Sequence, residues 1–221
     1  RHFLAELAEC VHQAASGRRL HVIAEDHRNL AAMIAPPDQG GWGLDAVWAD
    51  DFHHQMRRLL AGDREGYYRD FAGTTADIAT TVRQGWFFTG QYSEHLQEPR
   101  GTDPAGVPAE RFVVCLQTHD QVGNRALGDR LHHGVDGATY RAASVLLLTL
   151  PHTPLLFMGQ EWAASSPFRY FTDHEPALGR LVTEGRRREF KDFAAVADAA
   201  AREHIPEPQA GDTDHSSSRD R

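Results

Sequence analysis

The chain has 221 residues, of which 41% are hydrophobic, and a formal net charge of -8 at pH 7. These apolar residues suffice for a folded core, so a disordered chain is excluded. The acidic balance and the lack of a sustained Lys/Arg run argue against a surface that binds nucleic acid or an anionic membrane. The expected partner is a neutral or polar small molecule.

Cysteine usage and the first residues bear on the compartment. Cys10 falls in a helical pattern and Cys115 in an apolar run, and the two form neither a disulfide framework nor a paired metal motif. This predicts a reducing cytoplasm. No apolar run approaches the roughly 18 residues of a membrane span, and the N-terminus lacks the layout of a signal peptide.

The first half of the chain alternates helical and strand patterns. Apolar residues at helical spacing begin with Phe3, and a Pro/Gly-rich stretch over residues 35–43 predicts a loop between two strands. In chain order we predict a helix over residues 3–15, strands over 20–24 and 45–48, and helices over 52–60 and 74–85.

The second half follows a predicted long loop over residues 91–110, which carries four residues that interrupt a strand, namely Pro99, Gly101, Pro104 and Pro108. We then predict a strand over 112–116, a helix over 139–150, a strand over 154–158 and a helix over 184–202. Residues 206–221 are polar, and we expect them to form a disordered tail.

The predicted strands are continuous apolar runs rather than alternating ones. Such strands are buried on both faces, which predicts an α/β fold with a parallel sheet covered by helices. In a parallel sheet the carboxyl ends of all strands lie at one edge, and ligands bind there. The polar residues that follow the strands are therefore expected to share one site.

Carboxylates dominate the residues that follow the strands. When several carboxylates share a partly dry cleft, at least one has a raised pKa and can donate a proton near neutral pH. Cleavage of a glycosidic bond needs such a donor beside carboxylates that support a positively charged sugar. The residues at the strand ends are Glu25, Asp26, His27, Arg28, Asp50, Asp51, His119, Asp120 and Glu161, with Trp48, Phe52 and Trp162 as aromatic neighbours able to stack on sugars.

These residues also have simpler interpretations. A glutamate at a strand end is commonly solvated, and Asp50 and Asp51 precede a predicted helix, where aspartate is a good N-cap. The pairs His53-His54 and His132-His133 suggest a metal site. Neither pair has the i, i+4 spacing of helical zinc motifs, and adjacent residues point to different helix faces. We therefore predict no metal and no cofactor.

Six segments carry a family resemblance: VIAEDHRN (Val22 to Asn29), VWADDFHH (Val47 to His54), GYYRDF (Gly66 to Phe71), GQYS (Gly90 to Ser93), VVCLQTHDQVGNRALGDRL (Val113 to Leu131) and PHTPLLFMGQEWAASSPFRYFTDH (Pro151 to His174). In this order and spacing they resemble the α-amylase superfamily of glycoside hydrolases, and within it the maltooligosyltrehalose trehalohydrolases. The resemblance runs from residue 1 to about residue 208.

The resemblance implies a partial (β/α)8 TIM barrel, with strands five to eight and their helices in residues 1–205. It implies retaining hydrolysis of the α-1,4 bond next to the trehalose end of a maltooligosyltrehalose or related α-glucan, with release of trehalose. By position, Glu25 matches the general acid/base and Asp120 the carboxylate that stabilises the transition state. The residues expected to bind substrate are His119, Asp26, Arg28, Trp48, Asp50, Asp51 and Gln121.

The resemblance changes the role that spacing alone assigns to Asp120. Spacing pairs Glu25 with Asp120 as acid and nucleophile, whereas in this family the nucleophile is an aspartate at the end of the fourth barrel strand. That aspartate would lie upstream of residue 1. We therefore expect the isolated chain to be marginally stable and hydrolytically inactive, because a half-barrel leaves two open edges of buried-type strand.

Two departures from the family pattern and two alternative functions stay open. Thr118 stands where the family has Asn before His-Asp, and the tail after about Asp212 does not continue into the small β-sandwich expected downstream. The alternatives are a catalytically silent α-glucan-binding half-barrel and another enzyme of the clan, such as a branching enzyme. The segments VWADDFHH and GYYRDF favour trehalose release.

Overall fold

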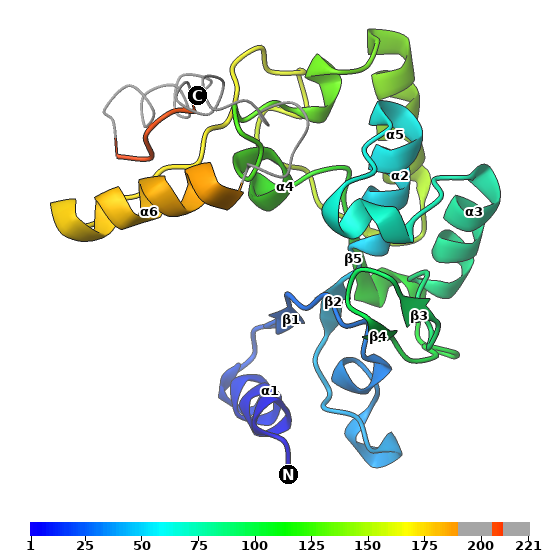
Figure 1. The fold of residues 1–221 in the computed structure, drawn as a ribbon. Helices are drawn as coiled ribbons and strands as arrows, with labels where there is room; N and C mark the ends of the chain where they lie inside the picture. Colours follow the sequence, from blue (N-terminus) through cyan, green and yellow to red (C-terminus); the bar gives the residue numbers. More distant parts are fainter. Residues whose placement is uncertain (190–204, 210–221) are drawn as a thin grey trace. The chain divides into compact units, whose positions relative to one another are not determined.

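The computed structural model describes residues 1–189 and 205–209 (Figure 1). Contacts divide the chain into two compact units, Arg1–Leu116 with Arg141–Leu155, and Gln117–Tyr140 with Leu156–Arg221, and each is described by itself. The predicted boundary between residues 205 and 206 stays a prediction. Residues 190–202 of the predicted last helix and 210–221 of the predicted tail lie outside the described residues.

The first unit is built on a four-stranded parallel sheet with the order β1-β2-β5-β6. These strands are β1 (Ile23–Ala24), β2 (Ala46–Trp48), β5 (Phe112–Val114) and β6 (Thr153–Pro154). The register pairs Ala24 with Val47, Trp48 with Val113, and Val114 with Pro154. The prediction of an α/β fold with a parallel sheet is confirmed, and strands that are neighbours in the sheet follow one another along the chain.

Four helices lie within two residues of their predicted bounds, whereas the helix over residues 119–123 was not predicted and the last helix begins at Pro176 rather than at residue 184. Thr74 caps the third helix, because its Oγ1 accepts a hydrogen bond from the Asp77 amide at 3.0 Å. The α-helices are α1 (Phe3–Ala14), α2 (Asp51–Ala61), α3 (Thr75–Gln84), α4 (His119–Gly123), α5 (Gly137–Thr149) and α6 (Pro176–Glu189), and the 3-10 turns are Ala31–Met33, Pro37–Gln39, Gly66–Asp70, Ala109–Arg111 and Leu131–His133.

An aromatic core fixes the segment after α3 to the sheet of the first unit. Trp86 is fully buried and packs edge-on against Phe112 of β5, with 5.2 Å between ring centroids. Its Nε1 donates a hydrogen bond to the Thr102 carbonyl at 3.0 Å, which satisfies the one polar atom that the ring buries. Phe88 packs edge-on against Phe71 at 5.6 Å. Residues 85–102 are thereby held against the sheet.

The second unit is held together around Arg130. This buried guanidinium donates through Nη1 to the Met158 carbonyl at 2.7 Å and through Nε to the Ser166 carbonyl at 2.8 Å. Its Cζ also lies 5.5 Å from the centroid of the Phe157 ring, within cation–π range. The loop from Met158 to Ser166 is therefore fixed by one side chain of the turn before residues 131–133.

Two predicted strands are shorter in the structure. Residues 20–22 fall outside β1 because the Val22 amide donates to the Asp45 carboxylate at 2.7 Å instead of to a neighbouring strand. At the other edge, β6 covers Thr153–Pro154 and not residues 154–158. The last backbone hydrogen bond to β5 is donated by the Leu155 amide to the Val114 carbonyl at 2.8 Å.

The predicted loop over residues 91–110 contains a hairpin, so that prediction is wrong in part. β3 (Tyr92–Ser93) and β4 (Glu98–Pro99) pair antiparallel. Pro99 is tolerated because a strand in a two-stranded hairpin has one side that needs no partner. Gln97 turns the chain with φ 60°, a left-handed conformation that no pattern in the sequence signals.

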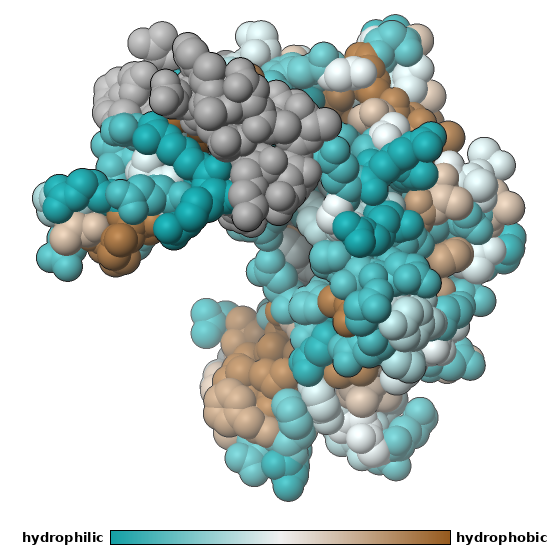
Figure 2. Space-filling view, viewed as in Figure 1, coloured by the Kyte–Doolittle hydropathy of each residue, from teal (hydrophilic) through white to brown (hydrophobic). Residues whose placement is uncertain are grey.

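Apolar residues gather on the surface over α1 in the first unit (Figure 2). Phe3 and Leu7 of α1 are 71% and 38% exposed, and Ile23 of the edge strand β1 is 48% exposed. Isolated apolar residues on a surface are ordinary, but a contiguous group beside an unpaired strand edge is typical of a face that other polypeptide covers. Within the described ranges, no helix has the length and apolarity to cross a membrane.

We expect Gly101→Ala to destabilise the protein much more than Gly106→Ala. Both glycines have left-handed φ angles, 84° and 83°, so both substitutions bring backbone strain of about 1–2 kcal/mol. A Cβ at Gly101 would also collide with the backbone carbonyl of Phe88, whereas a Cβ at Gly106 meets nothing within 4 Å. Urea denaturation of the two variants measures the difference, and equal losses would contradict the close approach at Gly101.

Candidate active site

The carboxyl end of the sheet in the first unit presents the predicted acid. Glu25 follows β1 directly and is exposed. Asp26 is half-buried and accepts hydrogen bonds from the Arg28 backbone amide at 2.8 Å and from its guanidinium Nη2 at 2.6 Å. The hydrogen bond and charge of Asp26 raise the pKa of Arg28. The β1 end thus carries one accessible carboxylate beside an ion pair that leaves Arg28 exposed.

Trp48 and Asp50 follow at the end of the neighbouring strand β2. Both side chains are half-buried. Burial favours a higher pKa for Asp50, but contact with His53, whose Nε2 lies 3.3 Å from Asp50 Oδ1, and the charge of Arg100 outweigh it and lower the pKa. Asp50 occupies the N-cap position of α2 yet makes no side-chain capping hydrogen bond. It is therefore an ionised carboxylate at neutral pH, and the capping interpretation loses its support.

Asp51, one residue later, lies in a different environment. Its side chain is completely buried and accepts four hydrogen bonds. Oδ1 accepts from Arg100 Nη2 at 2.7 Å, and Oδ2 accepts from Asn29 Nδ2 at 2.7 Å and from the amides of Phe87 and Phe88 at 2.8 and 3.0 Å. Because protein donors enclose this side chain completely, direct substrate contact by Asp51 stays a prediction without structural support.

In the second unit, Thr118 organises the His-Asp segment. Its Oγ1 accepts from the Asp120 amide at 3.2 Å and donates to Gln121 Oε1 at 2.8 Å, and its own amide donates to the same oxygen at 2.7 Å. This is a capping box. Thr118 therefore fixes the start of α4 and engages the Gln121 side chain, whose expected substrate contact stays a prediction.

His119 and Asp120 are the accessible groups of this segment. Their side chains are 57% and 44% exposed, and His119 Nε2 lies 3.4 Å from Asp120 Oδ1. The capping box holds their backbone, so both side chains leave a fixed turn. They can offer a sugar one carboxylate and one imidazole from adjacent positions.

The aromatic neighbours differ in accessibility. Phe52 is buried in the core of the first unit, so the suggestion that its ring stacks on a sugar is wrong. In the second unit Trp162 is 57% exposed, and Glu161 is exposed as well. Phe52 lies in the first two turns of α2, where residues 51–57 are all buried.

Of the paired histidines, His53 and His54 are buried, whereas His132 is half-buried and His133 is exposed. His54 is buried among aromatic rings, with centroids 4.7 Å from Tyr67 and 5.0 Å from Phe71, and burial lowers its pKa well below the ordinary value. In the second unit His132 and His133 both lie within hydrogen-bond distance of the Ala164 carbonyl. Among the described residues, no three His, Cys, Asp or Glu side chains gather in a way that could hold a metal ion.

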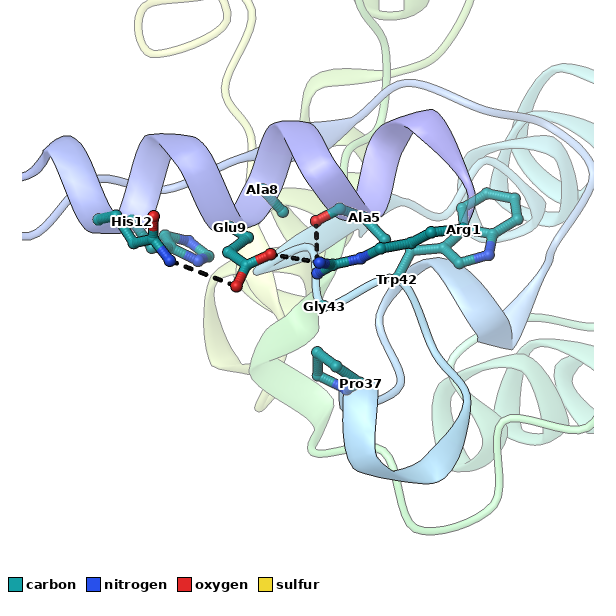
Figure 3. Close-up of a pocket in the computed structure, with 9 residues that line it drawn as sticks. Arg1, Ala5, Ala8, Glu9, His12, Pro37, Trp42 and Gly43 are labelled. Atoms are coloured by element: carbon teal, nitrogen blue, oxygen red, sulfur yellow. Dashed lines mark hydrogen bonds and ion pairs between the residues drawn. The ribbon is translucent and has the colours of Figure 1, made fainter.

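A cavity of about 420 Å³ lies away from these residues, between α1 and the loop over residues 36–43 (Figure 3). The Arg1 side chain lines this cavity and donates hydrogen bonds to the Glu9 carboxylate and to the Ala5 carbonyl. Trp42 closes another side and stacks on His2 at 3.6 Å. None of the predicted catalytic or substrate-binding residues lines this cavity.

Arg100 and Asn29 are the residues of this region that the sequence patterns did not single out. A buried carboxylate such as Asp51 requires charged or amide partners, but the sequence does not show that Asp51 is the buried one of two adjacent aspartates. Arg100 is 49 residues from Asp51 and Asn29 is 22 away, so chain distance gives no guide to the pairing. Asn29 also has φ 57°, a left-handed angle that asparagine tolerates better than most residues.

Comparison with known proteins agrees with this architecture. No family model matches the sequence. A crystal structure of a Salmonella typhimurium protein assigned as an α-amylase matches 98% of this chain and 36% of its own, with a TM-score of 0.85 and 40% sequence identity. The malto-oligosyltrehalose trehalohydrolase of Deinococcus radiodurans is 45% identical over 217 residues, and that of Mycobacterium tuberculosis 42% over 213 residues, or 96% and 94% of this chain.

The parallel α/β sheet with carboxylates at its strand ends, together with this structural match, defines an α-amylase-like protein. Within that class the chain is similar to a segment of the malto-oligosyltrehalose trehalohydrolases. It spans about a third of the length of the curated relatives it matches, 34% and 36% for the two above.

Proposed function

We propose that the chain forms part of a glycoside hydrolase that cleaves the α-1,4 bond next to the trehalose end of maltooligosyltrehalose and releases trehalose. One observation carries the proposal. An exposed glutamate, Glu25, directly follows a parallel strand in a chain that is 45% identical to a protein named for this reaction. The partner is the oligosaccharide or a related α-glucan, with no nucleic acid or membrane involved. Because Cys10 and Cys115 are free thiols, the cytoplasm suits the protein.

The four strands are proposed to be the fifth to eighth strands of a (β/α)8 barrel within a catalytic domain over residues 1–205. The order β1-β2-β5-β6 supports this, because a singly wound barrel keeps neighbouring strands in chain order whereas a doubly wound sheet reverses at its middle. Exposed Leu7 and Ile23 near β1 fit an edge that further strands cover.

The proposed mechanism is retaining. Glu25 protonates the oxygen of the departing group and then removes a proton from the attacking water, while Asp120 stabilises positive charge on the sugar. The nucleophile is an aspartate supplied by sequence other than these 221 residues. His119, Asp26, Arg28, Trp48, Asp50 and Gln121 contribute polar and aromatic contacts to the substrate.

Release of trehalose from maltotriosyltrehalose by the complete protein in which these residues occur tests the proposal. We expect hydrolysis of this substrate and little hydrolysis of maltopentaose, which has no trehalose end. The purified 221-residue chain is expected to release no trehalose, because it lacks the proposed nucleophile. Release of trehalose by the chain alone would contradict the proposal that the nucleophile lies outside these 221 residues. Binding of the oligosaccharide without hydrolysis by the complete protein would favour a catalytically silent glucan-binding module.

A further inference from the structure

We propose that Asp51 and Arg100 form a buried clasp that positions the segment carrying Glu25, which makes both of them positioning residues. The inference rests on the proposed role of Glu25 as general acid/base. It gives Asp51 a function that its burial allows, in place of the direct sugar contact suggested by its position after a strand.

Asp51 is the centre of the clasp because its two oxygens join three parts of the chain. Oδ1 accepts from the guanidinium of Arg100 at 2.7 Å, and Oδ2 accepts from Asn29 Nδ2 at 2.7 Å. The amides of Phe87 and Phe88 complete the set. The first residue of α2 thus connects the segment after β1 with the segment after α3.

Arg100 extends the clasp toward Glu25. While Nη2 contacts Asp51, Nε of the same guanidinium donates to the His27 carbonyl at 2.9 Å. Two residues further, the Asn29 carbonyl accepts from the Thr102 amide at 2.9 Å. The backbone two to four residues after Glu25 is therefore tied at two points, and one side chain makes the nearer tie.

The electrostatic environment makes the clasp rigid. Arg100 is 6% exposed and Asp51 is 0% exposed in their side chains, so neither charge can exchange its partner for water. The Arg100 guanidinium also lies 5.1 Å from the centroid of the Phe88 ring. Buried hydrogen-bonded ion pairs of this kind hold one geometry, and a general acid must stay within hydrogen-bond reach of the oxygen it protonates.

Arg100→Lys in the complete protein is the discriminating variant. Lysine keeps the charge beside Asp51, but its single ammonium cannot reproduce the two-pronged contact with Asp51 and the His27 carbonyl. We expect kcat for maltotriosyltrehalose to fall about 10- to 100-fold with KM changed less than about threefold, because the acid is misplaced while binding is kept. Arg83→Lys, at an exposed position on α3, is the matched control and should change neither value.

A substrate with an activated leaving group separates positioning from other roles. With 4-nitrophenyl α-maltotrioside the first step needs little protonation, so the rate of the initial 4-nitrophenol burst should fall less than about threefold in Arg100→Lys, while the later water step, which also uses Glu25, keeps its loss. A burst rate that falls as far as kcat for maltotriosyltrehalose, or a raised KM with normal kcat, would overturn the clasp in favour of direct sugar contact. If folded Arg100→Lys protein has the kcat and KM of the wild type, the contact between Asp51 and Arg100 serves only folding and the clasp is overturned.

Hydrogen exchange keeps the clasp testable apart from the proposed function. In Arg100→Lys the amides of residues 25–31 should exchange faster than in the wild type, whereas those of α3 should not change. Unchanged protection of residues 25–31 would overturn the clasp even if the enzyme proposal holds. Faster exchange in Arg100→Lys, found together with a wild-type protein that has no glycosidase activity, would leave the clasp standing and overturn the proposed function instead.

Discussion

Glu25→Gln in the complete protein is expected to lower kcat for trehalose release by about 10³-fold and to leave KM nearly unchanged. Glutamine keeps the size of the side chain and its hydrogen-bonding oxygen but cannot transfer a proton, and general acid/base catalysis contributes about 10²–10⁴-fold. Substrate binding relies on other residues, so the loss should fall on the chemical steps. Steady-state kinetics with maltotriosyltrehalose measure it.

The leaving group provides an internal check on the role of Glu25. With 4-nitrophenyl α-maltotrioside the first step needs little protonation, so Glu25→Gln should show a burst of 4-nitrophenol before the water step limits turnover. Glu6→Gln, at an exposed position on α1, removes an equivalent charge and should behave as the wild type. Near-normal turnover of the natural substrate by Glu25→Gln would remove Glu25 from the mechanism.

Continuous apolar runs predicted the centre of the sheet correctly, because burial on both faces leaves a direct mark on composition. β5 is the clearest case, since Phe112, Val113 and Val114 are all buried. The ends of the sheet were less predictable. There, pairing depends on single backbone groups, such as the Val22 amide, which donates to the Asp45 carboxylate.

Adjacent carboxylates mark the limit of what the sequence could reveal about the site. Asp50 and Asp51 both follow a predicted strand, so the sequence predicts the same role for each. In the structure Asp50 is half-buried beside His53, whereas Asp51 is completely buried. Successive helical residues point about 100° apart, so one faces the strand end and the next faces the core. The partner that decides the outcome, Arg100, comes from a distant loop whose course no local pattern specifies.

Asp120→Asn is expected to lower both kcat and kcat/KM by about 10²–10³-fold, the size of effect found when one preorganised electrostatic group is removed. Asparagine preserves the volume and an oxygen that can accept a hydrogen bond, and the Thr118 capping box depends on the Asp120 amide rather than on its side chain. The variant should therefore fold as the wild type and lose only the negative charge that stabilises the positively charged sugar.

The response to leaving groups distinguishes Asp120 from Glu25. Positive charge develops on the sugar whichever group departs, so 4-nitrophenyl α-maltotrioside should not relieve the loss in Asp120→Asn, whereas it relieves the first step in Glu25→Gln. Asp129→Asn, a partly exposed carboxylate 3.9 Å from Arg125, controls for a change of net charge in the second unit. Relief by the activated substrate would mean that Asp120 assists proton transfer. A raised KM with an unchanged kcat would make Asp120 a binding residue, because removing a group that acts equally on substrate and transition state leaves kcat intact.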